Sequence, residues 1–261
     1  MPFLKLEDVD LYYESFGAGE PILFAHGAGG NAAIWFNQLA YFSKRYRCIS
    51  FDHRGFARSR INADGDPDHL RVQQFRDDAL ALLDHLDIEQ AHLVGQSMGG
   101  FTVLRTTLDA PQRVKTLTFS ATSGGIYNPN PTPAVAKLTD SGDDSAGGVL
   151  ATMSAASKTK PELMQLYESI NNLNTEFSWA RLATLLGKDD VVAHGTLRQI
   201  ACKVLFIAGA EDPLFPPEQL AGMVPHFANA SIEVVNDSGH SPYFEQASVF
   251  NHLLEKHISD A

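Results

Sequence analysis

Cysteine, basic residues and long apolar runs are all scarce in this chain. Only two of its 261 residues are cysteine, and neither lies in a CxxC or Cys/His pattern, so no zinc or other metal site is indicated. Lys and Arg number 20 against 31 Asp and Glu and form no cluster, which argues against nucleic-acid binding. The first residues carry charges and include neither a signal-peptide core nor a membrane-spanning segment. We therefore expect a cytoplasmic protein without membrane association.

The remaining composition is that of an ordinary globular protein, with 44% hydrophobic and 20% charged residues. A chain of this length forms one large α/β domain or two smaller ones. Cys48 and Cys202 each lie in an apolar run, which favours two buried, reduced thiols, although a single disulfide between them stays open. The net charge of −11 identifies no partner, and nothing in the sequence sets the oligomeric state.

Short continuous apolar runs recur along the chain. They occupy residues 21–26, 47–52, 91–96, 114–120, 203–209 and 231–236. Uninterrupted apolar segments of this length are typical of parallel strands that are covered on both faces. An alternating apolar and polar segment that ends at Gly17 precedes them and predicts an antiparallel hairpin.

Helical patterns separate most of these runs. Residues 72–86 and 249–257 place apolar side chains at helical spacing. His252 and His257, both on the second of these segments, are expected at the surface. The alternation predicts an α/β fold with a mostly parallel sheet, an N-terminal antiparallel hairpin and helices on both faces.

The alternation is interrupted between residues 123 and 200, where the only periodic patterns are helical. We predict a helical cap or lid at 123–200, inserted into a core made of residues 1–122 and 201–261. Pro161 is expected at the start of one cap helix, and Thr175 is expected to cap another. Mobile connectors rich in Pro, Gly and Asp are expected to join the cap to the core.

Gly95-Gln96-Ser97-Met98-Gly99 is the strongest local signal for chemistry. It follows an apolar strand and precedes a helical pattern, the context of a nucleophile elbow, in which a strained turn raises the serine hydroxyl clear of the sheet. The glycines let neighbouring backbone approach closely. The helix that begins there directs free amides at the site. GxSxG fixes only three positions, so its strand–turn–helix context carries the prediction that Ser97 is a nucleophile.

A serine nucleophile needs a base and an acid that orients the base. In this architecture the expected order along the chain is Ser, then Asp or Glu, then His. Asp212 follows the run at 203–209, and His240 follows the next strand. Because parallel strands bring their carboxyl ends to one edge of the sheet, Asp212 and His240 are expected to meet Ser97 there.

The segment HGAGGN at residues 26–31 follows the first parallel strand. We expect the backbone N–H groups of Ala28 and Met98 to form an oxyanion hole. His26 is expected to shape this loop by hydrogen bonding. The same segment also satisfies G-x-G-x-x-G/A, and Asp52 lies 20 residues beyond Ala32, so a dinucleotide-binding oxidoreductase stays open as an alternative.

Taken together, these motifs resemble the α/β-hydrolase family across nearly the whole chain. The matching segments are HGAGGN (26–31), DHRGFARS (52–59), GQSMGG (95–100), GAEDPLFP (209–216) and SGHSPYFEQ (238–246). The resemblance implies that Ser97 is the nucleophile, His240 the base and Asp212 the acid. The family usually has DxRGxGxS, and Ala57 stands here in place of the third glycine, which we expect to be harmless.

Within this family the sequence resembles small cytoplasmic esterases, enol-lactonases of aromatic degradation and carbon–carbon bond hydrolases. We expect a serine hydrolase that cleaves a small carboxylic ester or lactone through an acyl-enzyme and needs no cofactor. A carbon–carbon hydrolase acting on a diketone-type substrate and a ligand receptor on a hydrolase scaffold stay open. Tyr127, Trp179 and Phe215 are candidates to line the pocket for this small-molecule substrate.

Overall fold

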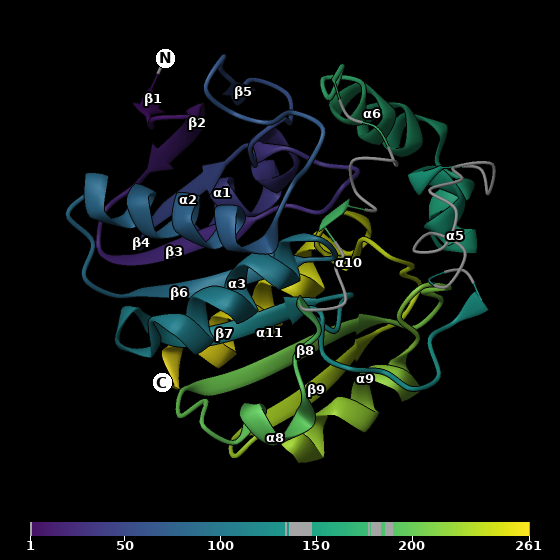
Figure 1. Ribbon diagram of the computed structural model, residues 1–261. Helices are drawn as coiled ribbons and strands as arrows, with labels where there is room; N and C mark the ends of the chain where they lie inside the picture. The colour runs from purple at the N-terminus through teal and green to yellow at the C-terminus, as the bar shows by residue number, and fades with distance from the viewer. Residues whose placement is uncertain are drawn as a thin grey trace.

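A nine-stranded sheet forms the centre of the fold, and helices cover both of its faces (Figure 1). This computed structural model describes residues 2–133, 135, 148–176, 178, 184–185 and 190–260. The strands in these ranges are β1 Phe3–Lys5, β2 Val9–Phe16, β3 Glu20–Ala25, β4 Tyr46–Phe51, β5 Arg60–Ile61, β6 Ala91–Gln96, β7 Val114–Ser120, β8 Lys203–Gly209 and β9 Ala230–Val235. The α-helices are α1 Phe36–Phe42, α2 Val72–His85, α3 Gly99–Asp109, α5 Ala155–Lys158, α6 Pro161–Asn171, α8 His194–Leu197, α9 Pro217–Met223, α10 Pro242–Glu245 and α11 Ala247–Ser259. The 3₁₀ helices are η1 Ala32–Trp35, η2 Pro111–Arg113, η3 Val149–Thr152 and η5 Val224–His226.

The sheet is mostly parallel. Its strand order is β1-β2-β4-β3-β6-β7-β8-β9, with β5 paired to β2. The pairs that involve β1, β2 and β5 are antiparallel, whereas β4, β3 and the strands beyond them pair in parallel. The predicted fold class is confirmed, and each of the six expected parallel strands lies within one residue of its predicted bounds. Over the part of the chain that is described, no helix has both the length and the apolar character needed to traverse a bilayer.

Alternate residues of β3 enter two different hydrophobic clusters. Ile22 and Phe24 pack on the face covered by α1 and α11, whereas Leu23 and Ala25 pack on the face covered by α2 and α3. All four side chains are buried, and each large one contributes roughly 1.5–3 kcal/mol to stability. A strand covered on both faces has no polar side, which explains why it is a continuous apolar run in the sequence.

The final helix differs from expectation at one position. His252 of α11 is exposed, as predicted, but His257 is only 4% exposed, so its expected place at the surface was wrong. The ring of His257 hydrogen-bonds the backbone of Leu117 in β7, and its Nε2 has no hydrogen-bond partner among the described residues. Burial lowers the pKa of His257 to about 4. Helical spacing identifies the faces of a helix but does not show that α11 crosses β7.

The described residues between β7 and β8 include η3, α5, α6 and α8, and α5 and α6 lie on the side toward which the parallel strands point (Figure 1). Helix α6 begins at Pro161, as predicted. Tyr167 and Ile170 of this helix are buried, whereas Leu166 is 41% exposed. The helix expected after Thr175 falls largely on residues outside the described ranges, so this helix and the cap boundaries stay predictions.

Both cysteines are free thiols. Cys48 is buried in β4, whereas Cys202, expected to be buried, is only half-buried just before β8. Burial raises the pKa of Cys48 to about 12 and that of Cys202 to about 11. Both groups are therefore neutral thiols at neutral pH and are weak nucleophiles.

Candidate active site

The three predicted catalytic residues each follow a different strand of the sheet. Ser97 comes directly after β6, Asp212 follows β8, and His240 follows β9. These strands run in parallel through β7, so their carboxyl ends meet at one edge. Open α/β sheets bind their ligands at this edge.

Ser97 occupies a sharp turn between β6 and α3. Its φ of +48° lies in the left-handed region, which is strained for a residue with a side chain. The turn is held by the Ser97 N–H, which donates to Ser120 O at 3.1 Å, and by the hydroxyl of Thr122, which donates to Ser97 O at 2.8 Å. A Cβ at Gly99 would lie 2.1 Å from the carbonyl oxygen of Ala25, so the turn packs directly on the backbone of β3.

His240 and Asp212 form a buried hydrogen-bonded pair. Nδ1 of His240 lies 2.9 Å from Oδ2 of Asp212, and each residue is only 3% exposed. Oδ1 of Asp212 accepts the N–H of Leu214 at 2.8 Å. Since an ionised carboxylate only accepts hydrogen bonds, we assign the ring proton to Nδ1, which leaves Nε2 with its lone pair. The ring of Phe215 lies nearly parallel to this imidazole, with 5.9 Å between centroids and 20° between planes.

Gln96 joins the serine turn to the histidine loop. Its side-chain Nε2 donates to the carbonyl oxygen of His240 at 3.0 Å, and the residue is 3% exposed. The sequence interpretation did not single out Gln96, although it lies inside the GxSxG motif. A polar residue at the buried end of an apolar strand was the signal that could have identified it, because such a group needs a partner.

The loop after β3 lies against Ser97. A Cβ at Gly27 would be 2.9 Å from the Cβ of Ser97, which shows how closely the two backbones approach. Ala28 and Met98 are 6% and 3% exposed, and neither backbone N–H donates to another described residue. Two buried amides beside the serine are therefore available to an oxygen atom of a bound molecule.

His26 holds this loop by two hydrogen bonds. Its Nε2 accepts the N–H of His53 at 2.9 Å, so the proton is assigned to Nδ1, which donates to the carbonyl oxygen of Gly27 at 2.7 Å. Burial lowers the pKa of His26 to about 4, so the ring is neutral at pH 7. A neutral ring fully engaged with backbone has no proton to exchange with a substrate.

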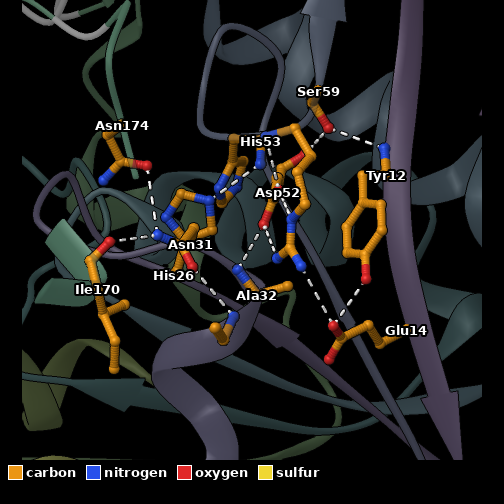
Figure 2. Close-up of polar contacts among 12 residues, drawn as sticks. Tyr12, Glu14, His26, Asn31, Ala32, Asp52, His53, Ser59, Ile170 and Asn174 are labelled. Carbon is orange, nitrogen blue, oxygen red and sulfur yellow. Dashed lines mark hydrogen bonds and ion pairs between the residues drawn. The ribbon is translucent and has the colours of Figure 1, made fainter. Parts of the chain in front are cut away.

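Asp52, the residue on which the dinucleotide interpretation depends, is fully buried and already has several partners (Figure 2). Its Oδ1 accepts the N–H of Ala32 at 2.6 Å, and Arg58 binds both of its oxygens, at 2.9 and 3.1 Å. A ribose hydroxyl would have to displace these contacts. The carboxylate instead stabilises the glycine-rich loop and the turn after β4.

The glycine-rich loop also contacts helix α6 and the residues just after it (Figure 2). Asn31 Nδ2 donates to the carbonyl oxygen of Ile170 at 2.8 Å, and Asn174 Nδ2 donates to the carbonyl oxygen of Gly30 at 3.0 Å. Asn31, Ile170 and Asn174 are all buried. Part of the segment predicted as a cap is thus bound to the loop that carries Ala28.

The three predicted pocket aromatics have different outcomes. Phe215 stacks on His240, as described above. Tyr127 is 52% exposed, and its ring lies against His194 with 6.0 Å between centroids. Trp179 lies outside the described residues. A role in substrate binding stays a prediction for all three.

Comparison with known proteins identifies the class to which this arrangement belongs. Residues 20–247 match the family model described as the alpha/beta hydrolase fold. The match covers well over half of the chain, and the chain therefore belongs to the alpha/beta hydrolase fold family.

Several relatives match over nearly their whole length. The chain is 29% identical to the 3-oxoadipate enol-lactonase 2 of Acinetobacter baylyi, covering 97% of this chain and 94% of that protein. It is 25% identical to a 2-hydroxy-6-oxononadienedioate/2-hydroxy-6-oxononatrienedioate hydrolase of Pseudomonas putida, covering 97% and 94%. Among solved structures, Est816, described as an N-acyl homoserine lactone degrading enzyme, is 28% identical with a TM-score of 0.82, covering 98% and 99%.

Proposed function

We propose that this protein is a serine hydrolase that cleaves a small carboxylic ester or lactone through an acyl-enzyme. One observation carries the proposal: a buried Asp212–His240 pair shares one sheet edge with Ser97 on a strained elbow, and Gln96 links the two loops. A serine hydroxyl becomes a competent nucleophile only with such an oriented base.

In the proposed reaction, Nε2 of His240 accepts the proton of Ser97 as the serine oxygen attacks the substrate carbonyl. Asp212 keeps the proton on Nδ1 and stabilises the imidazolium that forms. His240 then donates its proton to the leaving oxygen, and the C–O bond of the ester or lactone breaks. A water molecule activated by His240 hydrolyses the acyl-enzyme and regenerates Ser97.

The backbone amides of Ala28 and Met98 are the proposed donors to the tetrahedral oxyanion. Both are buried and neither donates to another described residue, so they need no rearrangement when negative charge develops. One preorganised donor of this type contributes about 3 kcal/mol of transition-state stabilisation.

The ester or lactone class is supported by the two relatives whose names refer to lactones, at 29% and 28% identity over nearly the whole chain. An open-chain ester and a lactone present the same carbonyl to the same three groups. A carbon–carbon hydrolase is the alternative, because a relative at 25% identity is named as a hydrolase of a 2-hydroxy-6-oxo dienedioate, a keto substrate, and the same three residues serve carbon–carbon bond cleavage.

We also propose residues 123–200 as a cap that shapes the substrate pocket. The described contacts support this arrangement, because Ile170 and Asn174 bind the glycine-rich loop and Thr152 O accepts the N–H of His240 at 3.0 Å. Phe215 is the proposed apolar wall beside the base.

The test compares the wild type with Ser97→Ala on p-nitrophenyl butyrate, a panel of lactones and a vinylogous diketone. Ser97→Ala is expected to lose at least about 10³-fold in kcat while keeping its melting temperature, because the nucleophile is removed without a change in packing. Ser169→Ala, a change at an exposed serine of α6, is the matched control. Undiminished turnover by Ser97→Ala would refute the proposal.

The alternative functions predict other results in the substrate panel or in two further assays. Turnover of the diketone in preference to esters and lactones would assign the carbon–carbon hydrolase instead. Labelling of Ser97 by a fluorophosphonate without turnover of any substrate would favour a ligand receptor. Saturable binding of NADH would favour the dinucleotide-binding oxidoreductase.

A further inference from the structure

Glu245, the last residue of α10, is a buried acid with an unusual set of partners. It is 6% exposed, and its carboxylate accepts three backbone N–H groups. Oε1 accepts from Gly239 at 2.9 Å and from Ser241 at 3.1 Å, and Oε2 accepts from Ser154 at 2.8 Å. Among the described residues no Lys or Arg pairs with it.

Two of these N–H groups belong to the residues on either side of His240. The backbone of His240 itself is held as well, because its N–H donates to Thr152 O at 3.0 Å and its carbonyl oxygen accepts from Gln96 at 3.0 Å. Glu245 thus completes a set of contacts that fixes the peptide groups from 239 to 241. The side chain of His240 starts from a backbone that has little freedom to move.

The third N–H group comes from residues 152–155, which belong to the proposed cap and which we call the brace. The brace contacts the histidine loop again through the hydroxyl of Ser154, which donates to Asp237 O at 3.0 Å. It contacts the acid loop through the N–H of Ala155, which donates to Oε2 of Glu211 at 2.8 Å. Glu211 directly precedes Asp212, so the brace is bound to both loops of the proposed triad.

The fit between the brace and the histidine loop is close. A Cβ at Gly239 would lie 2.1 Å from Thr152 O and 2.8 Å from the nitrogen of Ser154. The two backbones therefore touch directly, and a shift of one displaces the other. The carboxylate of Glu245 lies at this contact and bonds to both sides of it.

We propose that Glu245 is a positioning residue that sets the place of His240 by joining its two flanking amides to the brace. The inference rests on the proposed hydrolase function, in which Nε2 of His240 must meet the hydroxyl of Ser97. Glu245 touches neither substrate nor reacting atoms and acts through the histidine loop. Displacement of a catalytic group by about 1 Å lowers the rate by about 10²-fold. A histidine loop without these contacts would let His240 move by such a distance, and the reaction would be slower.

The first test replaces the carboxylate. Glu245→Gln keeps the shape of the side chain but turns one acceptor oxygen into an NH₂ donor, which then faces a backbone N–H on one side. The expected result is a fall in kcat of about 10- to 100-fold with KM changed less than about threefold. A rate defect without a binding defect indicates a misplaced base.

The second test removes the opposite partner. Ser154 has φ −64°, which proline adopts without strain, and Met153 before it is extended, as a residue before proline prefers. Ser154→Pro therefore deletes the N–H that binds Glu245. Ser154→Ala loses the same hydroxyl but keeps the N–H. The ratio of kcat between the alanine and proline variants measures the loss of the amide contact together with displacement of the carboxylate by the proline ring, and we expect about 10-fold or more.

Combining the changes shows whether the two residues act as one link. If they do, Glu245→Gln with Ser154→Pro has a kcat close to that of Glu245→Gln alone, because both changes break the same contact. Independent multiplication of the two defects would show that the brace and Glu245 act separately and would overturn the proposal.

A spectroscopic readout separates this proposal from the hydrolase proposal. The Nδ1 proton of His240, bonded to Asp212, is expected to give a far-downfield proton resonance in the wild type. Glu245→Gln and Ser154→Pro should broaden or shift this resonance more than Ser154→Ala does, because Ser154→Ala removes the hydroxyl contact with Asp237 but keeps the amide that binds Glu245. If the wild type lacks turnover, the proposed function fails while the resonance still tests the positioning role. If Glu245→Gln lowers only the melting temperature and leaves kcat and the resonance intact, Glu245 is merely structural.

Discussion

Acidification is expected to destabilise this protein through histidines that are buried in the neutral form. Burial lowers the pKa of both His26 and His257 from 6.5 to about 4. Between these values the unfolded chain binds protons that the folded chain excludes, so stability is complete above pH 6.5, falls as the pH drops toward 4, and then levels off. A pH of 5 lies one and a half units below the unfolded pKa of 6.5, so each histidine lowers the free energy of unfolding by about 2 kcal/mol at that pH.

The two histidines together therefore remove about 4 kcal/mol at pH 5, a large share of the 5–15 kcal/mol that typically stabilises a domain. Asp78 works in the opposite direction, because burial raises the pKa of its carboxyl from 3.8 to about 6 despite its pairing with Arg54. Asp78 binds a proton more readily in the folded chain than in the unfolded chain. This difference raises the free energy of unfolding by about 1 kcal/mol at pH 5. The total pH dependence thus mixes several groups, and a variant is needed to isolate one.

His257→Leu is the appropriate variant, because His257 lies away from the sheet edge that carries Ser97 and its Nε2 has no hydrogen-bond partner among the described residues. The assay is urea denaturation at pH 7 and pH 5 for the wild type, His257→Leu and the exposed control His252→Leu. Loss of the contact with Leu117 lowers stability equally at both pH values. The difference between pH 7 and pH 5 should therefore be smaller by about 2 kcal/mol in His257→Leu and unchanged in His252→Leu. Equal pH dependence in all three proteins would refute the reasoning.

Two further predictions concern backbone geometry. Gly27→Ala places a Cβ 2.0 Å from Oε1 of Gln96 and 2.9 Å from the Cβ of Ser97, so kcat/KM for the best ester should fall at least about 10-fold. Gly222→Ala, with nothing within 4 Å of its Cβ in helix α9, should keep full activity and gain up to about 1 kcal/mol; full activity in both variants would contradict the steric argument. Ala57, where the family usually has glycine, has a φ of +41° in the left-handed region. Ala57→Gly should therefore raise stability by about 1 kcal/mol in urea denaturation, and a loss of stability would show that the turn is not strained.

The elements that were predicted well are those specified by neighbours in the sequence. Helix α6 begins at Pro161 because proline suits the first turn of a helix. The six parallel strands were recognisable because a strand covered on both faces has no polar side. The turn at Ser97 was identified because its glycines allow an approach that a Cβ would block, as the contact between Gly99 and Ala25 illustrates.

The features that were missed depend on distant partners. His257 is buried by its contact with β7, 140 positions earlier in the chain, and no local pattern reports that distance. Asp52 satisfied the spacing of a dinucleotide fingerprint, yet Ala32 and Arg58 occupy its oxygens. Glu245 lies inside the segment SGHSPYFEQ at residues 238–246, which resembles the family motif. Its importance appeared only when the amide of Ser154, 91 residues away, proved to be its partner.

The sequence by itself therefore determined the class of fold, the strands that Ser97, Asp212 and His240 follow, and the sheet edge at which those strands end. Periodicity, turn chemistry and the parallel arrangement of strands were sufficient for this, because each acts over a few residues or follows from topology. Only the tertiary structure decided how the three loops are held together, through Gln96 and through Glu245. Those contacts arise when segments far apart in the chain pack against one another, and buried polar groups must then take whatever partners the packing brings within hydrogen-bond reach.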